Sequence, residues 1–282
     1  MLLPSPSLRI VATILAKNEE DIIGKVIEHH INQGVRQFIL TDNDSSDRTK
    51  EIAAKYPEVV EILDEPGNDH HQSLWVSRMA RIACKFQPDW IIHLDADELW
   101  TNVQNLRTVQ APVAACEGMY LHPPTEGNFN IANQRWYIDV DHTPLPKITR
   151  VAHRPDPNIV ILHGNHTVEG CPNVEVIHNI PIHHYPIRSY NQWASKATKH
   201  LCLKRRNSIC KRWENWYHML QENKLEPEYN KLVNCWKRLI QGSNDLADFL
   251  QIVGLWCTPE VLHYLQENQI MPKIGEWPCE TK

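Results

Sequence analysis

The chain has 282 residues, 42% hydrophobic and 22% charged, which is the composition of an ordinary globular protein. Its formal net charge of -5 does not provide the basic surface that a nucleic-acid-binding protein needs, and no apolar run approaches the ~18 residues that cross a bilayer. The eight cysteines contain no C-x-x-C pair, so neither a zinc site of that kind nor a dithiol redox motif is expected. Because the first residues lack the features of a signal peptide, we expect a cytoplasmic protein with reduced thiols.

The first hundred residues alternate between predicted strands and helices. Strands are predicted at 9–15, 36–40, 59–63 and 90–94, and helices from 18 or 19 to 34, at 48–55 and at 71–86. In the last of these helices, Leu74, Met79, Ile82, Ala83 and Phe86 are predicted to face the core. Strands that alternate with helices of this length favour right-handed crossovers and an α/β fold with a mostly parallel sheet.

The pattern changes after Trp100. Residues 101–188 contain short extended runs at 118–122, 136–140, 147–151 and 159–163, with many prolines and histidines between them. Loops of this kind usually carry substrate contacts. From Ser189 the chain is predicted to be helical and basic, with later helices at 228–240, 244–253 and 258–268.

The most informative segment ends the fourth predicted strand and reads W-I-I-H-L-D-A-D-E-L-W at residues 90–100. An apolar run of this type is typical of a buried central strand, and open α/β sheets bind ligands at the carboxyl ends of their strands. Asp95 and Asp97 would point the same way in an extended segment, and such a pair favours a divalent cation. The alternative is an acidic strand-to-loop turn with a helix cap.

Two further polar loops are predicted at the same edge of the sheet. One contains Asn18 and Glu19 after the first strand, and the other reads T-D-N-D-S-S-D-R-T from Thr41 after the second. In the second loop Asp47 is expected to cap the next helix, which leaves Asp42, Asn43 and Asp44 as acceptors for a base or ribose. Three such loops are typical of a nucleotide site. The sequence has neither a Walker A loop nor G-x-G-x-x-G, which argues against P-loop NTPases and dinucleotide enzymes.

Taken together, these two loops, the segment at 90–100 and the H-H-Y-P-I-R-S run at 183–189 resemble a bacterial branch of the family-2-type glycosyltransferases, which have a GT-A fold. The resemblance implies a Rossmann-type, mostly parallel sheet flanked by helices. It covers about residues 8–200, with a donor half at 8–100 and an acceptor half at 101–200. Residues 201–282 would be a helical C-terminal extension.

The resemblance also implies roles for individual residues. Asp97 would bind a divalent metal, Mn²⁺ or Mg²⁺, that bridges the donor diphosphate, and His184 would complete the metal site. Arg78 and Arg81 are candidates to face the donor from the preceding helix. The implied donor-binding residues are Asn18, Glu19, Asp42, Asp44, Arg78, Asp95, Lys147 and His166.

The implied reaction transfers a sugar from a nucleotide-sugar, a UDP-sugar by analogy, to a hydroxyl of a glycan, a lipid-linked or another acceptor, as in hexosyltransferases. A direct displacement inverts the anomeric carbon and needs a carboxylate to take the acceptor proton. Glu126, Asp141 and Glu169 are the candidates for this base, and each is equally well explained as a surface carboxylate. Without a transmembrane segment, the enzyme would work in the cytoplasm or at the inner face of the membrane.

Three alternatives are weighed against this prediction. A nucleotidyltransferase would need a glycine-rich basic loop after the first strand, and this loop has no glycine. A non-catalytic glycan-binding or scaffolding relative would bind the donor nucleotide weakly or not at all. A zinc hydrolase could use His163, His166, His183 and His184, but their spacing lacks H-E-x-x-H, and His178 and His183 are better explained as hydrogen-bonded core residues. The lysines at 196, 199 and 204 are expected to form a solvated helix face.

Overall fold

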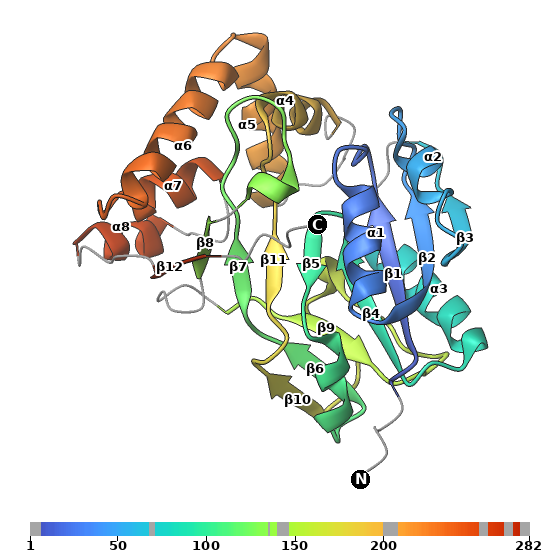
Figure 1. Ribbon diagram of the computed structural model, residues 1–282. Coiled ribbons are helices and arrows are strands. Elements are labelled where there is room, and N and C mark those ends of the chain that lie inside the picture. The colour runs from blue at the N-terminus through green and yellow to red at the C-terminus, as the bar shows by residue number, and fades with distance from the viewer. Residues whose placement is uncertain are drawn as a thin grey trace. The chain divides into compact units, whose positions relative to one another are not determined.

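The structure is a computed structural model (Figure 1) that describes residues 7–67, 71–134, 136–139, 147–199, 208–253, 259–267 and 273–276. The chain divides into two compact units. The first unit contains Met1–Met119 and Ile148–His183, and the second contains Tyr120–Lys147 and His184–Lys282. The predicted domain bounds at 8–200 and 201–282 stay a prediction.

The first unit is built on a seven-stranded sheet in the order β10-β6-β9-β4-β1-β2-β3. The four strands predicted in the first hundred residues lie together and are parallel, whereas β9 runs antiparallel to β4 and β6. The strands of this sheet are β1 (Ile10–Ala16), β2 (Val35–Asp42), β3 (Val59–Asp64), β4 (Trp90–Asp95), β6 (Val113–Cys116), β9 (Arg150–His153) and β10 (Val174–Ile177). The mostly parallel α/β sheet is therefore confirmed.

Helices flank this sheet, as predicted (Figure 1). They are α1 (Ile23–Asn32), α2 (Thr49–Ala53), α3 (Gln72–Ala83) and the 3₁₀ helices η1 (Cys84–Phe86), η2 (Val103–Thr108) and η5 (His163–Asn165). The first helix begins later than predicted, because the Glu19 carbonyl accepts the N–H groups of both Ile22 and Ile23 in a turn before it.

Helix α3 packs against one face of the sheet through a stripe of apolar residues. The buried cluster joins Val76, Met79, Ala80 and Ala83 of α3 to residues of the sheet that include Val11. Leu74 was predicted to join this core, and that prediction is wrong, because the residue is 61% exposed. At 100° per residue, Leu74 lies about 200° around the helix from Val76 and so faces away from the sheet.

The predicted extended run at 159–163 is not a strand. It makes one isolated bridge, between Ile161 and Val168, and then enters η5. The backbone groups of Ile161 bond instead to side chains of α3, since its N–H donates to the Ser77 hydroxyl and its carbonyl accepts from the Ser73 hydroxyl. Helix α3 therefore supplies the hydrogen bonds that a neighbouring strand would otherwise make.

The second unit contains the helical C-terminal region that the sequence predicted. In it, β8 (Trp136–Asp139) pairs antiparallel with β12 (Lys273–Glu276) and with Tyr120 and Leu121 of β7 (Met119–Leu121). Buried aromatic residues hold its helices, as in the edge-to-face contact of Trp193 and Trp216 at 5.3 Å between ring centroids. The helices are α4 (Tyr190–Lys199), α5 (Ser208–Gln221), α6 (Leu225–Leu239), α7 (Leu246–Val253) and α8 (Pro259–Glu267). Over the described ranges, no helix is long and apolar enough to cross a bilayer.

Candidate active site

Three loops leave the sheet of the first unit at the carboxyl ends of β1, β2 and β4. In the strand register, Ala16 pairs with Asp42 and Leu15 pairs with Asp95. The three loops therefore begin side by side, as predicted. However, β4 ends at Asp95, and a turn at residues 96–97 leads into β5 (Glu98–Trp100). Asp95 and Asp97 thus do not share one extended segment, contrary to the prediction.

The first two loops are hydrogen-bonded to each other. Asn18 adopts a left-handed conformation (φ 52°), its N–H donates to the Ser45 hydroxyl, and its side-chain oxygen accepts from the Ser46 N–H at 2.7 Å. The N–H of the buried Glu19 donates to the Thr49 hydroxyl at 2.7 Å. Asn18 therefore shapes the edge of the site through its contacts with the second loop.

The second loop presents acceptor oxygens at the end of β2. Asp42 is buried; one carboxylate oxygen accepts from the Ser45 N–H at 3.1 Å, and the other has no hydrogen-bond partner within the described ranges. Asp44 is exposed and left-handed (φ 57°). Asp47 accepts from the Thr49 N–H at 3.0 Å and so bonds the first turn of α2, but the N-cap residue is Arg48, one position later than the predicted cap at Asp47. Asp42 is thus the loop's buried acceptor, and Asp44 its solvent-facing one.

Arg78 of α3 is connected to this loop by Glu65. Its guanidinium pairs with the Glu65 carboxylate at 2.5 Å. The backbone of Glu65 in turn accepts from the Asn43 amide and donates to the Asp42 carbonyl. Arg81, the second predicted candidate on this helix, is exposed.

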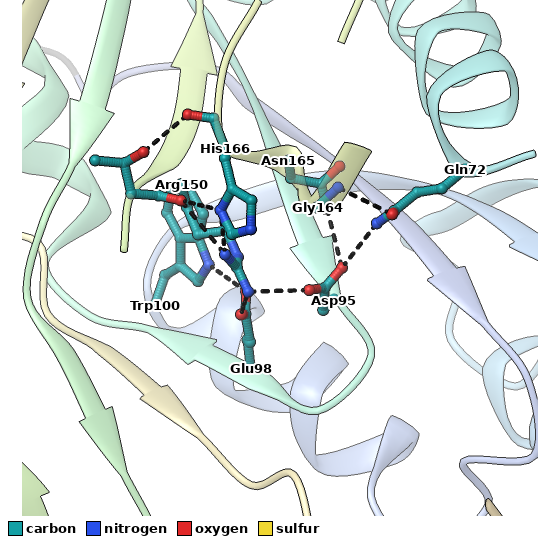
Figure 2. A network of polar contacts seen from close by, with 9 residues as sticks. Gln72, Asp95, Glu98, Trp100, Arg150, Gly164, Asn165 and His166 are labelled. Atoms are coloured by element: carbon teal, nitrogen blue, oxygen red, sulfur yellow. Dashed lines mark hydrogen bonds and ion pairs between the residues drawn. The ribbon is translucent and has the colours of Figure 1, made fainter. Parts of the chain in front are cut away.

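Asp95 stands at the centre of a polar network in the third loop (Figure 2). One carboxylate oxygen accepts from Arg150 at 3.1 Å, and the other accepts from the Asn165 amide at 3.0 Å and from Gln72 at 3.5 Å. The Gln72 side-chain oxygen accepts the Gly164 N–H at 3.0 Å. Residues from α3, β4, β9 and η5 thus fix the orientation of this carboxylate.

Arg150 is a buried cation that the sequence analysis missed. It lies on β9, its side chain is 3% exposed, and it makes a bidentate pair with Glu98, whose side chain is fully buried. Burial lowers the pKa of the guanidinium, but the charges of Glu98, Asp95 and Asp97 outweigh it, so the pKa is raised. The sequence did contain a signal for this cation, namely a single arginine in an apolar strand. A buried arginine requires an acidic partner.

Two histidines of α1 hold the strand that follows the acidic turn. The Trp100 carbonyl accepts from His29 Nε2 at 2.9 Å, and the Trp100 N–H donates to His30 Nε2 at 3.1 Å. His30 Nδ1 then carries its proton and donates to the Val26 carbonyl. Burial, together with the nearby His29, lowers the pKa of His30 to about 3. His29 and the neutral imidazole of His30 thus anchor β5 just beyond the acids.

His166 lies on the other side of Arg150, after a turn that needs glycine. Its Nδ1 is 2.8 Å from Arg150 Nη1 and 2.8 Å from the Thr149 carbonyl oxygen. Gly164 has φ 76°, and a Cβ atom there would lie 2.4 Å from the His166 ring. The turn therefore sets the position of the imidazole.

The charges of this network fit a divalent cation. Asp95, Asp97 and Glu98 all act on the guanidinium of Arg150, and the formal charges of these four side chains sum to -2. Asp97 is buried (7% exposed), and a buried carboxylate needs partners that compensate its charge. The described residues contain no group of three or more histidines, cysteines or acids arranged to hold a metal by themselves. A bound cation would therefore need oxygens from a ligand, as Mg²⁺ and its analogues usually do.

The remaining predicted residues lie elsewhere in the described structure or outside it. Glu126, in the second unit, is exposed and pairs with Lys237. Glu169 is exposed on a loop of the first unit, Lys147 is exposed in the second unit, and Asp141 lies outside the described residues. His184 is buried in the second unit, where its carbonyl accepts the His122 N–H.

The histidines predicted as core residues differ from each other. His183 is fully buried, as expected. His178 is not a core residue, because its side chain is 70% exposed and pairs with Glu117. The zinc hydrolase gains no support from the described part of the chain, where no metal-binding cluster of these residue types is found.

An α/β domain with three polar loops at the carboxyl edge of its sheet has these loops where open α/β sheets bind their ligands. The sequence model described as Glycosyl transferase family 2 matches residues 12–166, more than half of the chain. The chain belongs to this family and is a glycosyltransferase, so the predicted family and enzyme class are confirmed.

Two solved structures illustrate the similarity. One is S. aureus TarS 1–349 in complex with UDP, with 12% identity, coverage of 93% of this chain and 88% of that chain, and a TM-score of 0.44. The other is glucosyl-3-phosphoglycerate synthase from Mycobacterium tuberculosis in complex with Mn²⁺, UDP and glucosyl-3-phosphoglycerate, with 18% identity, coverage of 40% and 44%, and a TM-score of 0.30. Among curated proteins, none matches the sequence.

Proposed function

We propose that this glycosyltransferase transfers a sugar from a UDP-sugar to an acceptor hydroxyl, with inversion, and that it uses Mn²⁺ or Mg²⁺. The observation that carries the proposal is the acidic segment at the end of β4, where the carboxylates of Asp95, Asp97 and Glu98 all act on the guanidinium of Arg150. The TarS structure contains UDP, and the synthase structure contains UDP and Mn²⁺, which agrees with this choice of ligands.

Different residues of the site would bind different parts of the donor. Asp97 would hold the metal, which stabilises the charge that the leaving diphosphate gains. Asp95, fixed by Arg150 and Asn165, would orient the ribose or metal-bound water. Asp42 offers its second carboxylate oxygen to N–H groups of the base.

Other proposed donor-binding residues belong to the loops after β1 and β2 and to helix α3. Asn18 and Glu19 join the first two loops, Asp44 faces solvent beside them, and Arg78 approaches through Glu65. Lys147 remains a proposal as a donor-binding residue, and His184 remains a proposal as a metal ligand.

The acceptor hydroxyl must lose a proton as it attacks the sugar carbon, so a base is required. We keep Glu126, Asp141 and Glu169 as the candidates and expect single alanine variants to distinguish them. Substitution of the base should leave UDP binding intact and lower transfer strongly, whereas substitution of a surface carboxylate should change neither.

Calorimetric titration of UDP and GDP, with and without Mn²⁺, tests the donor site. We expect UDP binding that depends on Mn²⁺ and is lost in Asp97→Ala. Glu169→Ala serves as the matched control for binding, because Glu169 is an exposed carboxylate of the same unit. Equal binding by Asp97→Ala would refute the metal role. No nucleotide binding under any metal would favour a scaffolding or glycan-binding relative.

A further inference from the structure

Arg150 has more polar neighbours than an ordinary salt bridge needs. An arginine side chain carries five N–H donors and no acceptor. Two of these N–H groups reach Glu98 and one reaches Asp95. The Nη1 group lies 3.3 Å from the Thr149 carbonyl and 2.8 Å from His166 Nδ1. Each of the five donors therefore has one acceptor only if His166 Nδ1 accepts.

The alternative arrangement of His166 is unfavourable. If Nδ1 carried a proton and donated it to the Thr149 carbonyl, two N–H groups, of His166 and of Arg150, would lie against each other with their nitrogens 2.8 Å apart and no acceptor between them. Arginine cannot respond by accepting. The Thr149 carbonyl does not need that donor, because Arg150 already donates to it. A doubly protonated ring is unfavourable for the same reason, because its Nδ1–H would also lie against an Arg150 N–H.

We propose that Arg150 is a positioning residue that fixes His166 in the neutral tautomer with its proton on Nε2. His166 then acts as a hydrogen-bond donor to an oxygen of the bound nucleotide-sugar and not as a general base. This role rests on the proposed function, whereas the tautomer itself does not. The same guanidinium thus orients Asp95 on one side and sets the donor direction of His166 on the other (Figure 2).

The tautomer can be measured directly on the full chain. Histidine-labelled protein gives two-bond ¹H–¹⁵N spectra in which the protonated and unprotonated ring nitrogens are distinct, and the His166→Gln variant identifies the signals of His166 by their loss. We expect a proton on Nε2 and none on Nδ1 near neutral pH. A proton on Nδ1, or on both nitrogens, would overturn the inference.

Substitution of Arg150 provides a second test. In Arg150→Met, Nδ1 loses its donor while the Thr149 carbonyl remains 2.8 Å away, so the proton should move to Nδ1. An unchanged tautomer in a folded Arg150→Met protein would contradict the positioning role. If that variant does not fold, Arg150→Lys keeps the charge but loses the planar fork, and the wild-type spectrum still decides the tautomer.

The donor role requires a functional readout. A glutamine amide places an N–H near the position of Nε2, so His166→Gln should keep transfer within about tenfold of wild type, whereas His166→Ala should lose about ten- to a hundredfold. His178→Gln is the control, since that histidine is exposed and lies outside the network. Equal losses in the glutamine and alanine variants would refute the donor role. A wild-type protein that binds no UDP would refute the donor role and the proposed function but would leave the tautomer standing.

Discussion

Replacing Arg150 by methionine should destabilise the first unit more than any single change at its surface. The substitution removes the cation but leaves Glu98, which is fully buried, without its bidentate partner. Methionine has a similar length and fills the space of the arginine stem, so packing changes little. The change in the free energy of unfolding therefore comes mainly from the lost charge.

The expected cost follows from the burial of both partners. Removing one member of a buried ion pair costs about 3–5 kcal/mol, because the remaining charge is desolvated and unpaired. That is a large part of the ~5–15 kcal/mol that stabilises a typical domain. The double variant Arg150→Met/Glu98→Met removes both charges and should cost less than the sum of the single variants, with an interaction energy of about 1–3 kcal/mol.

Urea unfolding, followed by circular dichroism and by tryptophan fluorescence, measures these free energies. Coincidence of the two probes shows that one transition is being compared. Arg107→Met is the matched control, because Arg107 is exposed and bonds only to Gln104 in the described contacts; its cost should stay within about 0.5 kcal/mol. A cost below about 1 kcal/mol for Arg150→Met, or additive costs in the double variant, would refute the account of Arg150 as a buried, charge-paired centre.

Two further predictions concern the glycine turn and the buried histidines. Gly164→Ala should weaken UDP binding and lower the free energy of unfolding, because the new Cβ atom would meet the His166 ring. Gly170 has a similar φ of 69° but lies in open space, so Gly170→Ala should lower the free energy of unfolding only by about 1 kcal/mol. Equal effects of the two variants in thermal unfolding and in calorimetry would contradict this. Burial lowers the pKa of His30 to about 3 and that of His153 to about 4, so the unfolded chain binds more protons below its histidine pKa of ~6.5. Stability should thus be full above pH 6.5 and fall toward pH 4, by about 2 kcal/mol for each of these residues at pH 5; a urea midpoint that is unchanged between pH 7 and pH 5 would contradict it.

The sequence allowed the parallel half of the sheet to be predicted because three of its strands, β1, β2 and β4, are buried along most of their length, whereas β3 lies partly exposed at the edge. Such buried strands appear as uninterrupted apolar runs, and the register between Leu15 and Asp95 follows once neighbouring strands are parallel. The shorter strands β5, β6 and β10 have three or four residues each, too few for a periodic signal. Their positions depend on pairing with distant segments.

The polar contacts of the site were harder to predict for a related reason. Arg150 is 52 residues from Glu98, and Trp100 is 70 residues from His30. Nothing near Arg150 in the sequence identifies its acidic partner, and a buried histidine has the same local pattern whether it binds a metal or a backbone carbonyl. The acidic turn could be found because its carboxylates are adjacent, whereas the cation that orients them comes from another strand.

The position of Arg150 explains how the acidic turn can stay assembled before any ligand arrives. Asp95, Asp97 and Glu98 would repel one another at the end of β4 and the start of β5, and one guanidinium bonds Asp95 and Glu98 directly while its charge also acts on Asp97. Without this cation the buried Glu98 would carry an unpaired charge, which is costly to fold. The same contact that stabilises the fold therefore also holds Asp95 in the orientation on which the proposed donor site depends.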